Sequence, residues 1–233
     1  MAKYNRILVK VSGEALAGKD GHGIDNDAVV KVAKELSLVA DGGVQVAVVV
    51  GGGNFWRGRT SNNMNRVVAD QIGMLATVMN ALALGDALSQ CGVANKVYSA
   101  VTVDKTLPCY IAGDAVKALQ EGKVVVFGGG TGAPFFSTDT AAVLRACEVG
   151  AQAVVCAKAV DGVYDSDPKL NPNAKKYDEI SFDKVIADNL KALDVTAMAM
   201  CREYNLPVLV YHNEEPNGLA RVLNGEKLGT IIK

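Results

Sequence analysis

The stretch Val44-Gln45-Val46-Ala47-Val48-Val49-Val50-Gly51-Gly52-Gly53-Asn54 places an almost continuously apolar run directly before three glycines. A second stretch, Val124-Val125-Val126-Phe127-Gly128-Gly129-Gly130, has the same form. Such runs are typical of strands buried on both faces of a parallel sheet. Ligands bind at the carboxyl ends of these strands, and glycine lets backbone N–H groups approach an anion there. We therefore interpret the pair as a phosphate cradle, although two tight turns would also explain it.

Shorter apolar runs and longer helical segments alternate along the chain. We predict strands at 7–11, 44–50, 96–101, 123–127, 153–157, 207–211 and 228–232. We predict helices at 25–41, 64–91, 113–121, 138–149, 181–187, 194–204 and 218–223. The polar stretch 161–176 is expected to be an ordered loop. The alternation indicates βαβ units, so we expect an α/β fold, a single three-layer α/β/α sandwich with a mostly parallel sheet spanning 1–233.

Composition excludes several classes of function. The 233 residues include 24 Lys and Arg against 25 Asp and Glu, so we expect no nucleic acid or membrane surface as a partner. Two histidines make a histidine-based metal site improbable, and the five cysteines have no C-x-x-C spacing, which favours small core residues in a reducing compartment. We expect no signal peptide and no apolar run long enough to span a bilayer, hence a cytoplasmic protein.

The predicted helix at 64–91 is apolar on most of its circumference. From Met74 to Leu84 only Thr77 and Asn80 are polar. One stripe at helical spacing comprises Val68, Ile72, Leu75, Met79 and Leu82, and a second comprises Met74, Val78, Ala81 and Leu88. A helix that is apolar on most sides must be buried on most sides. Burial within the monomer and burial in a subunit interface are both open, and we favour the interface.

Two familiar phosphate-binding motifs nearly occur and are rejected. Gly13-x-x-x-x-Gly18-Lys19 resembles a P-loop, but Asp20 stands where Ser or Thr should bind magnesium. Gly128-x-Gly130-x-x-Ala133 resembles a dinucleotide fingerprint, but the next residues, Pro134-Phe135-Phe136, cannot begin the required helix. The remaining candidate is Lys10 at the end of the first strand. A buried lysine there requires an anionic partner, whereas a lysine at the sheet edge can instead extend to water.

The residues after Lys10 carry a specific resemblance. Lys10-Val11-Ser12-Gly13-Glu14-Ala15-Leu16 resembles the opening of the bacterial UMP kinases, a group of the amino-acid kinases. The similarity continues in order at 51–58, 64–80, 131–139, 160–168 and 225–230, so it covers essentially the whole chain. Ala133 and Lys158 depart from the usual pattern. The resemblance implies an amino-acid-kinase fold that transfers the γ-phosphoryl group of ATP to UMP, giving UDP and ADP in pyrimidine nucleotide biosynthesis.

The resemblance also implies roles for individual residues. On the ATP side it places Lys10, Val11, Ser12, Gly13, Gly53, Arg57, Lys158, Tyr164 and Asp167. On the UMP side it places Gly52, Asp70, Thr131, Gly132, Ala133, Pro134, Phe135, Phe136, Ser137 and Thr138. The implied catalytic residues are Lys10, Arg57 and Asp139, with Mg²⁺ bound through the phosphates of ATP and not by direct protein ligands. The N-terminal part would serve mainly UMP and the C-terminal part mainly ATP.

Regulation and assembly are also implied by the resemblance alone. A loop linked to GTP activation in some members corresponds to Gly18, Lys19, Asp20, Gly21, His22 and Gly23. We therefore expect an allosteric enzyme that GTP activates and UTP inhibits. We also expect a homohexamer built as a trimer of dimers.

Simpler explanations and rival functions remain. Asp70 could be an acid in a first helical turn, Thr138 a helix N-cap and Asp167 a turn residue. One rival is another amino-acid kinase acting on a carboxylate or carbamate. The resemblance of residues 65–70 and 131–139 to the UMP kinases argues against that function. The other is a non-catalytic oxyanion-storage protein, which should have lost Lys10 and Arg57.

Overall fold

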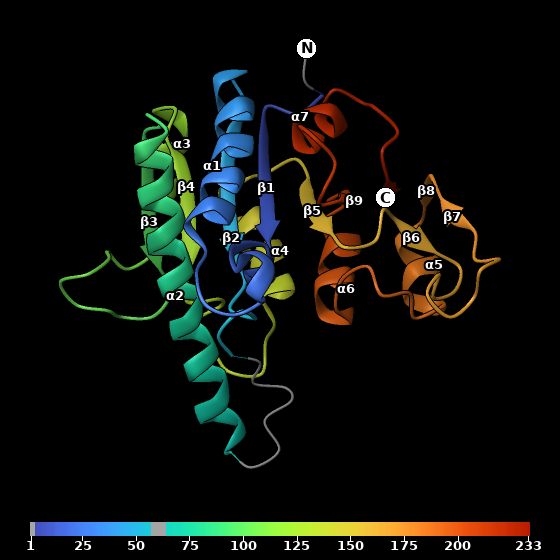
Figure 1. Ribbon diagram of the computed structural model, residues 1–233, viewed down its shortest axis with the longest axis horizontal. Helices are drawn as coiled ribbons and strands as arrows, with labels where there is room; N and C mark the ends of the chain where they lie inside the picture. Colours follow the sequence, from blue (N-terminus) through green and yellow to red (C-terminus); the bar gives the residue numbers. More distant parts are fainter. Residues whose placement is uncertain (1–2, 57–63) are drawn as a thin grey trace.

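The computed structural model describes residues 3–56 and 64–233, and its centre is an eight-stranded sheet in the order β3-β4-β2-β1-β5-β9-β10-β8 (Figure 1). The strands are β1 Arg6–Val11, β2 Gln45–Val50, β3 Asn95–Ser99, β4 Val124–Gly128, β5 Val154–Lys158, β8 Glu179–Ile180, β9 Val208–His212 and β10 Thr230–Ile232. From β3 to β9 all neighbours are parallel, whereas β10 pairs antiparallel with β9 and parallel with β8, so the last two strands of the sheet run in the opposite direction. The carboxyl ends of β1, β2, β4 and β5 therefore meet at one edge.

Seven α-helices lie among the described residues, in two layers. They are α1 Asn26–Asp41, α2 Arg66–Gln90, α3 Ala112–Gln120, α4 Thr138–Val149, α5 Phe182–Ala187, α6 Val195–Glu203 and α7 Gly218–Leu223. One core contains residues of α1, α2 and α7, and the other contains residues of α3, α4, α5 and α6. In Figure 1, α1 and α2 stand in front of the sheet and α4 behind it. The predicted α/β/α sandwich is confirmed.

Alternation along β1 decides where its functional residue points. Ile7, Val9 and Val11 pack in the core on the α1 side, and Leu8 packs in the core on the α4 side. Successive side chains of a strand point to opposite faces. Lys10 therefore points to the same side as Leu8, toward α4.

Helix boundaries follow the capping residues. Asp25 accepts a hydrogen bond from Ala28 N before α1, Asn65 caps α2 and Asp194 caps α6. Side-chain oxygens at the N-cap accept from the free amides of the first turn. The helices predicted at 25–41, 64–91 and 194–204 begin at these caps or one residue earlier, and all seven predicted helices are confirmed within two residues.

Two strand predictions need correction. The stretch 161–176 is not only a loop, because β6 Val163–Tyr164 pairs antiparallel with β7 Lys176–Tyr177, and β8 was also missed. These strands are two residues long, too short to show a period. The strand predicted to reach 101 ends at Ser99, whose hydroxyl donates to Val101 O and accepts from Val101 N. That local turn ends the pairing with β4.

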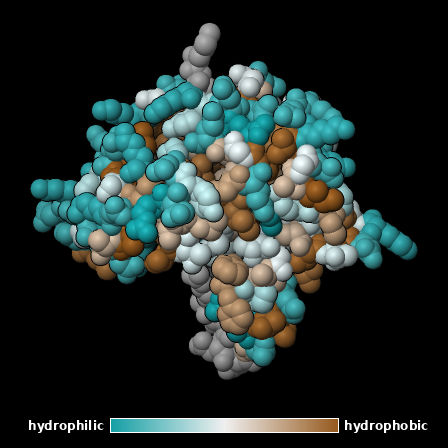
Figure 2. Space-filling model, turned by 180° about the vertical axis from the view of Figure 1, so that it is seen from behind, coloured by the Kyte–Doolittle hydropathy of each residue, from teal (hydrophilic) through white to brown (hydrophobic). Residues whose placement is uncertain are grey.

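Helix α2 buries only part of its apolar surface. Val78, Ala81, Leu84 and Leu88 are in the core, so Val78 belongs to the monomer interior. The other stripe is open: Val68, Leu75, Met79 and Leu82 are 36–51% exposed. The first turns of α2 project below the sheet in Figure 1, and Figure 2 shows apolar residues on this projection from behind.

By length and composition alone, α2 could cross a membrane, so the expectation that no apolar run is long enough was wrong. However, 44% of its most apolar window is already buried within the fold. The core helix of a soluble protein meets the same criterion, which makes this weak evidence for a membrane span.

Candidate active site

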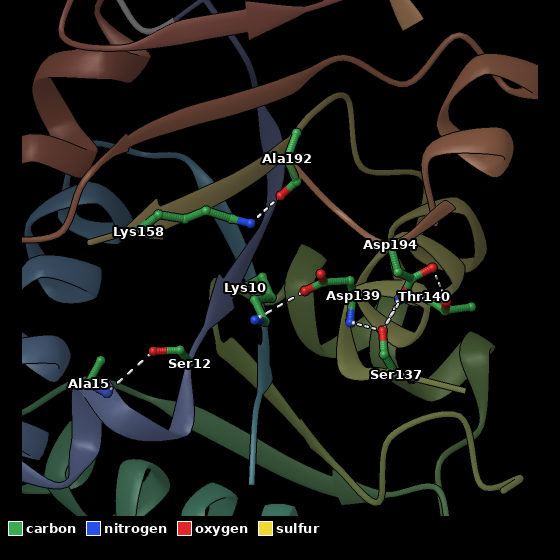
Figure 3. A network of polar contacts seen from close by, with 9 residues as sticks. All are labelled: Lys10, Ser12, Ala15, Ser137, Asp139, Thr140, Lys158, Ala192 and Asp194. Carbon is green, nitrogen blue, oxygen red and sulfur yellow. Dashed lines mark hydrogen bonds and ion pairs between the residues drawn. The ribbon is translucent and has the colours of Figure 1, made fainter. Parts of the chain in front are cut away.

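Lys10 and Asp139 form an ion pair at the carboxyl edge of the sheet. Lys10 Nζ lies 3.1 Å from Asp139 Oδ1, in the first turn of α4 (Figure 3). Burial lowers the pKa of Lys10, but the neighbouring negative groups, with Asp139 the strongest of them, together outweigh burial, and the net pKa is raised. Lys10 is therefore positively charged at neutral pH, and it has the anionic partner that its position requires.

A cavity of about 400 Å³ lies beside this pair and is called the first cavity here. Lys10, both glycine turns and the N-terminal half of α2 line it. Of the residues predicted for UMP, it is lined by Gly52, Asp70, Thr131, Ala133, Phe136, Ser137 and Thr138. Gly132, Pro134 and Phe135 belong to the same loop but are not lining residues. Ser12, Gly13 and Gly53, which were predicted for ATP, also line this cavity.

Glycine is required at two positions of this wall. A Cβ at Gly13 would come within 2.4 Å of Asn54 Oδ1 and 2.7 Å of Gly53 N. A Cβ at Gly52 would come within 2.8 Å of Gly73 O on α2. The turns after β1 and β2 can therefore approach each other and α2 only without side chains. The resulting wall is backbone, which suits an anion.

The N-terminus of α4 faces the first cavity. Ser137 is the N-cap, accepting from Asp139 N at 3.0 Å and Thr140 N at 3.4 Å, so the suggestion that Thr138 is the cap is wrong. Thr138 lines the cavity instead. The positive end of a helix dipole and the first amides favour a negative group here.

Asp194 supports this helix start and was missed as a site residue. It accepts hydrogen bonds from Ser137 Oγ and from Thr140 Oγ1 at 3.0 Å, and it caps α6 through Ala197 N (Figure 3). The sequence indicates only that Asp194 caps a helix. Its contact with Ser137 could not be predicted, because the two residues are 57 positions apart. Asp194 thus connects the starts of α4 and α6.

Asp70 holds the far side of the first cavity. It accepts from Phe135 N at 2.7 Å and from Arg66 Nε at 2.8 Å. Phe135 has φ 74, which is strained for a residue with a side chain, and Arg66 lies 5.5 Å from its ring centroid. Strain of this kind concentrates at functional sites, where surrounding contacts maintain it. Asp70 therefore fixes the loop over the cavity.

The residues predicted for adenosine lie in a second region. Lys158, Tyr164 and Asp167 line a cavity of about 420 Å³. Tyr164 donates to Asp161 at 2.7 Å, which raises the pKa of Tyr164, and Lys176 pairs with Asp161 at 2.9 Å. Asp167 accepts from Lys169 N, so it acts as a turn residue, and its contact with a nucleotide stays a prediction. Lys158 Nζ donates to Ala192 O (Figure 3).

The ion pair lies between the two regions. A third cavity, of about 470 Å³, is lined by both Lys158 and Asp139. Lys10 lines the first cavity, and its partner Asp139 lines the third. Lys158 lines both the third cavity and the cavity of about 420 Å³ beside Tyr164. Two anionic ligands entering from opposite sides would meet at Lys10.

Asp139 is the residue here that fits a magnesium ion. Among residues 3–56 and 64–233 no group of three or more His, Cys, Asp or Glu could hold a metal. Carboxylate oxygens suit Mg²⁺, which usually binds one or two of them together with phosphates. The Asp139 side chain lies beside Lys10 and is 19% exposed, so its carboxylate can be reached by a Mg²⁺ ion that the phosphates also bind.

The remaining predicted residues are dispersed. Arg57 lies outside the described residues. Val11 lines a cavity of about 810 Å³ on the α1 side, together with Gly18, Lys19 and Asp20, and this cavity shares Lys10 and Ser12 with the first cavity. Gly23 is connected to the glycine turn after β2, because Asn54 Nδ2 donates to Gly23 O and Gly23 N donates to Asn54 O. Burial raises the pKa of Cys156 to about 11, so this core thiol is protonated at neutral pH.

Comparison with known proteins agrees with this arrangement. The model of the amino acid kinase family matches residues 5–212. The chain belongs to the amino acid kinase family. This amino acid kinase is similar to the solved UMP kinase of Bacillus anthracis, with 38% identity, a TM-score of 0.95 and coverage of 99% of this chain and 96% of that one.

Two further solved structures are similar. The UMP kinase of Ureaplasma parvum has 39% identity, a TM-score of 0.93 and 99% coverage of both chains. The uridylate kinase of Archaeoglobus fulgidus has 27% identity, a TM-score of 0.74 and full coverage of both chains. The likeness to these two bacterial enzymes extends over essentially the whole fold of this amino acid kinase.

Proposed function

We propose that this amino acid kinase is a UMP kinase, which transfers the γ-phosphoryl group of ATP to UMP and forms UDP and ADP for pyrimidine nucleotide synthesis. The observation that carries the proposal is the first cavity. Its glycine turns, Asp70 and the 131–138 loop surround a space that ends at a charged lysine. The similar bacterial structures, which match over nearly their entire length, are UMP kinases.

The two nucleotides are assigned to opposite sides of the Lys10–Asp139 pair. UMP occupies the first cavity, with its ribose hydroxyls at Asp70 and its phosphate at the start of α4 near Thr138. ATP places its adenosine beside Tyr164 and Asp167 and its phosphates beside Lys10, Ser12 and Gly13. Within the single domain, the N-terminal part thus serves mainly UMP and the C-terminal part mainly ATP.

Catalysis in this arrangement depends on position and charge. Both reactants are anionic, and the acceptor is a phosphate oxygen that is already ionised near neutral pH, so it needs no strong base. Lys10 places a positive charge where negative charge accumulates on the transferring group, and Asp139 holds the Lys10 ammonium in position. Arg57 is proposed to bridge phosphates from the other side. Mg²⁺, when bound with ATP, neutralises charge on the phosphates, and Asp139 is the carboxylate that would face it.

We also propose a cytoplasmic homohexamer built as a trimer of dimers, with the open stripe of α2 as the dimer contact. Four of its apolar residues are 36–51% exposed along one face, and soluble monomers rarely leave such a patch in water. A twofold contact between identical helices would cover it.

GTP activation and UTP inhibition are proposed as the regulatory inputs. For GTP, the support is the connection from the 18–23 loop through Asn54. Asn54 and Asn80 exchange hydrogen bonds of 3.0 and 2.7 Å, and Asn80 donates to Gly51 O. Any displacement of the loop is thereby passed to the glycine turn.

A coupled assay of ADP release against UMP, CMP, dCMP and aspartate tests the function. We expect magnesium-dependent turnover with UMP and little with CMP. Equal turnover of UMP and CMP would contradict uridine specificity. Turnover with aspartate alone would indicate a carboxylate kinase, and no turnover with any acceptor would favour a non-catalytic binding protein.

A further inference from the structure

Arg145 is a buried cation that no part of the proposed chemistry uses. It lies in the middle of α4 and is only 4% exposed. Burying a guanidinium costs free energy that only close partners can offset, and an apolar side chain of similar volume would fill the same space without that cost. The direction of its polar atoms therefore indicates what it does.

Part of the guanidinium is held by neighbours away from the first cavity. Its carbon lies 4.1 Å from the centroid of the Tyr110 ring, and Nη1 pairs with Glu148 one turn later on α4. The Tyr110 hydroxyl also donates to Glu148, at 2.8 Å. Burial and the Glu148 carboxylate raise the pKa of Tyr110, so this hydroxyl stays protonated and keeps donating at neutral pH. The direct contacts of Arg145, the Tyr110 ring and the Glu148 carboxylate, thereby fix the guanidinium plane.

Its other end reaches the glycine turn after β4. Nη2 donates to Gly130 O and to Thr131 O, each at 3.5 Å, and Gly130 and Thr131 both line the first cavity. The turn is held from the opposite side as well, because Gly129 N donates to Thr77 Oγ1 of α2 at 2.7 Å. Gly129 and Gly130 have φ of 80° and 60°, a conformation that glycine adopts easily but does not enforce. External contacts must therefore fix this turn.

We propose that Arg145 is a positioning residue for the acceptor nucleotide, fixing the Gly130 and Thr131 carbonyls so that the turn keeps the shape that UMP requires. Its ion pair, ring contact and hydrogen bonds go to Glu148, Tyr110, Gly130 and Thr131, none of which is assigned to ATP, so its effect falls on the acceptor side. The inference rests on the proposed function only in the identity of that nucleotide. The fixing of the turn itself is a property of the free protein.

The test compares Arg145→Met and Arg145→Lys with the matched control Tyr110→Phe. The control keeps the ring against the guanidinium and removes only the hydroxyl bond to Glu148, away from the turn. We expect Arg145→Met to raise the KM for UMP about tenfold, the usual effect of losing a charge-assisted hydrogen bond, while the KM for ATP and kcat change much less. Arg145→Lys keeps the positive charge but loses the planar guanidinium with its several N–H donors, so its KM for UMP should lie between those of wild-type protein and Arg145→Met. Tyr110→Phe should leave the KM for UMP unchanged.

Hydrogen exchange on the nucleotide-free proteins provides the second readout. We expect faster exchange of the amides at 129–132 in both Arg145 variants and not in Tyr110→Phe. A lower melting temperature with unchanged KM for UMP and unchanged exchange at 129–132 would show that Arg145 is only a core residue. Should wild-type protein fail to use UMP, the proposed function would fall, but faster exchange at the turn would still support the positioning role. If Arg145→Met does not fold, Arg145→Lys gives the same comparison.

Discussion

At the scale of the residue, the Lys10 ammonium is the group on which the proposed chemistry depends. It is charged because Asp139 and the other neighbouring negative groups together outweigh the effect of burial on its pKa, and it lies between the first cavity and the cavities that Lys158 lines. We expect Lys10→Ala to reduce turnover about a hundredfold or more, the typical effect of removing a group that stabilises developing charge. Steady-state kinetics measure this, and circular dichroism checks the fold. Lys123→Ala, which removes an exposed lysine at the start of β4, is the control and should retain full activity. Near-normal turnover in Lys10→Ala would remove Lys10 from the mechanism.

Asp70 allows a cleaner substitution, because asparagine has nearly the same shape. Asn at position 70 can still accept from Phe135 N, so the loop stays in place. It loses the negative charge and one acceptor that a ribose diol would use. We expect Asp70→Asn to raise the KM for UMP about tenfold, as for a lost charge-assisted hydrogen bond, with a smaller change for ATP. Initial rates with each nucleotide varied in turn measure both constants. A defect confined to ATP would mean that the two nucleotides are assigned the wrong way round.

The sequence predicted site residues where the residue types that the chemistry requires lie close together in the chain. Lys10 at a strand end and the two glycine turns were recognisable because each requirement is met within a few neighbouring residues. Asp194 and Arg145 were not, because their partners lie far along the chain or on backbone carbonyls. Ser137 lies 57 residues from Asp194, and the carbonyls that Arg145 binds leave no mark in residue type. Only the folded chain brings these groups together.

At the scale of the element, α2 is the helix whose faces the sequence could not tell apart. Both of its stripes are apolar, so periodicity predicted burial on both sides but not which stripe the sheet covers. The structure places Val78 in the core and leaves Leu75 and Met79 in the open stripe. Helices were otherwise well predicted, because a capping side chain marks the start of α1, α2, α4, α5 and α6. In contrast, the two-residue strands β6, β7 and β8 owe their pairing to tertiary contacts.

A charge in the open stripe tests the proposed dimer contact. We expect Leu75→Glu or Met79→Glu to dissociate the assembly, because a carboxylate cannot be buried unpaired against a second copy of the helix. Sedimentation at micromolar protein measures the mass. Leu38→Glu, at an exposed apolar residue of α1, is the matched control and should leave the mass unchanged. Wild-type protein that sediments as an active monomer near 24.4 kDa would show that the stripe needs no partner. Val78→Glu, in contrast, should destabilise the monomer itself.

At the scale of the whole molecule, the parallel sheet is what makes the site. It brings the ends of β1, β2, β4 and β5 to one edge, although β5 begins 148 residues after β1. The first cavity opens on one side of Lys10 and the Lys158 cavities on the other. This arrangement could be predicted from the alternation of strands and helices. The positions and shapes of the cavities on either side of Lys10 could not, because they depend on side chains from several helices and loops.

The assignment of the two nucleotides to the two sides is the central claim, and a crystal structure with UMP, a non-hydrolysable ATP analogue and magnesium tests it most directly. We expect the UMP ribose at Asp70 and its phosphate at Thr138, the adenosine beside Tyr164, and the γ-phosphate within hydrogen-bonding distance of Lys10 Nζ. UMP bound among Lys158, Tyr164 and Asp167, or phosphates bound away from Lys10, would contradict the account.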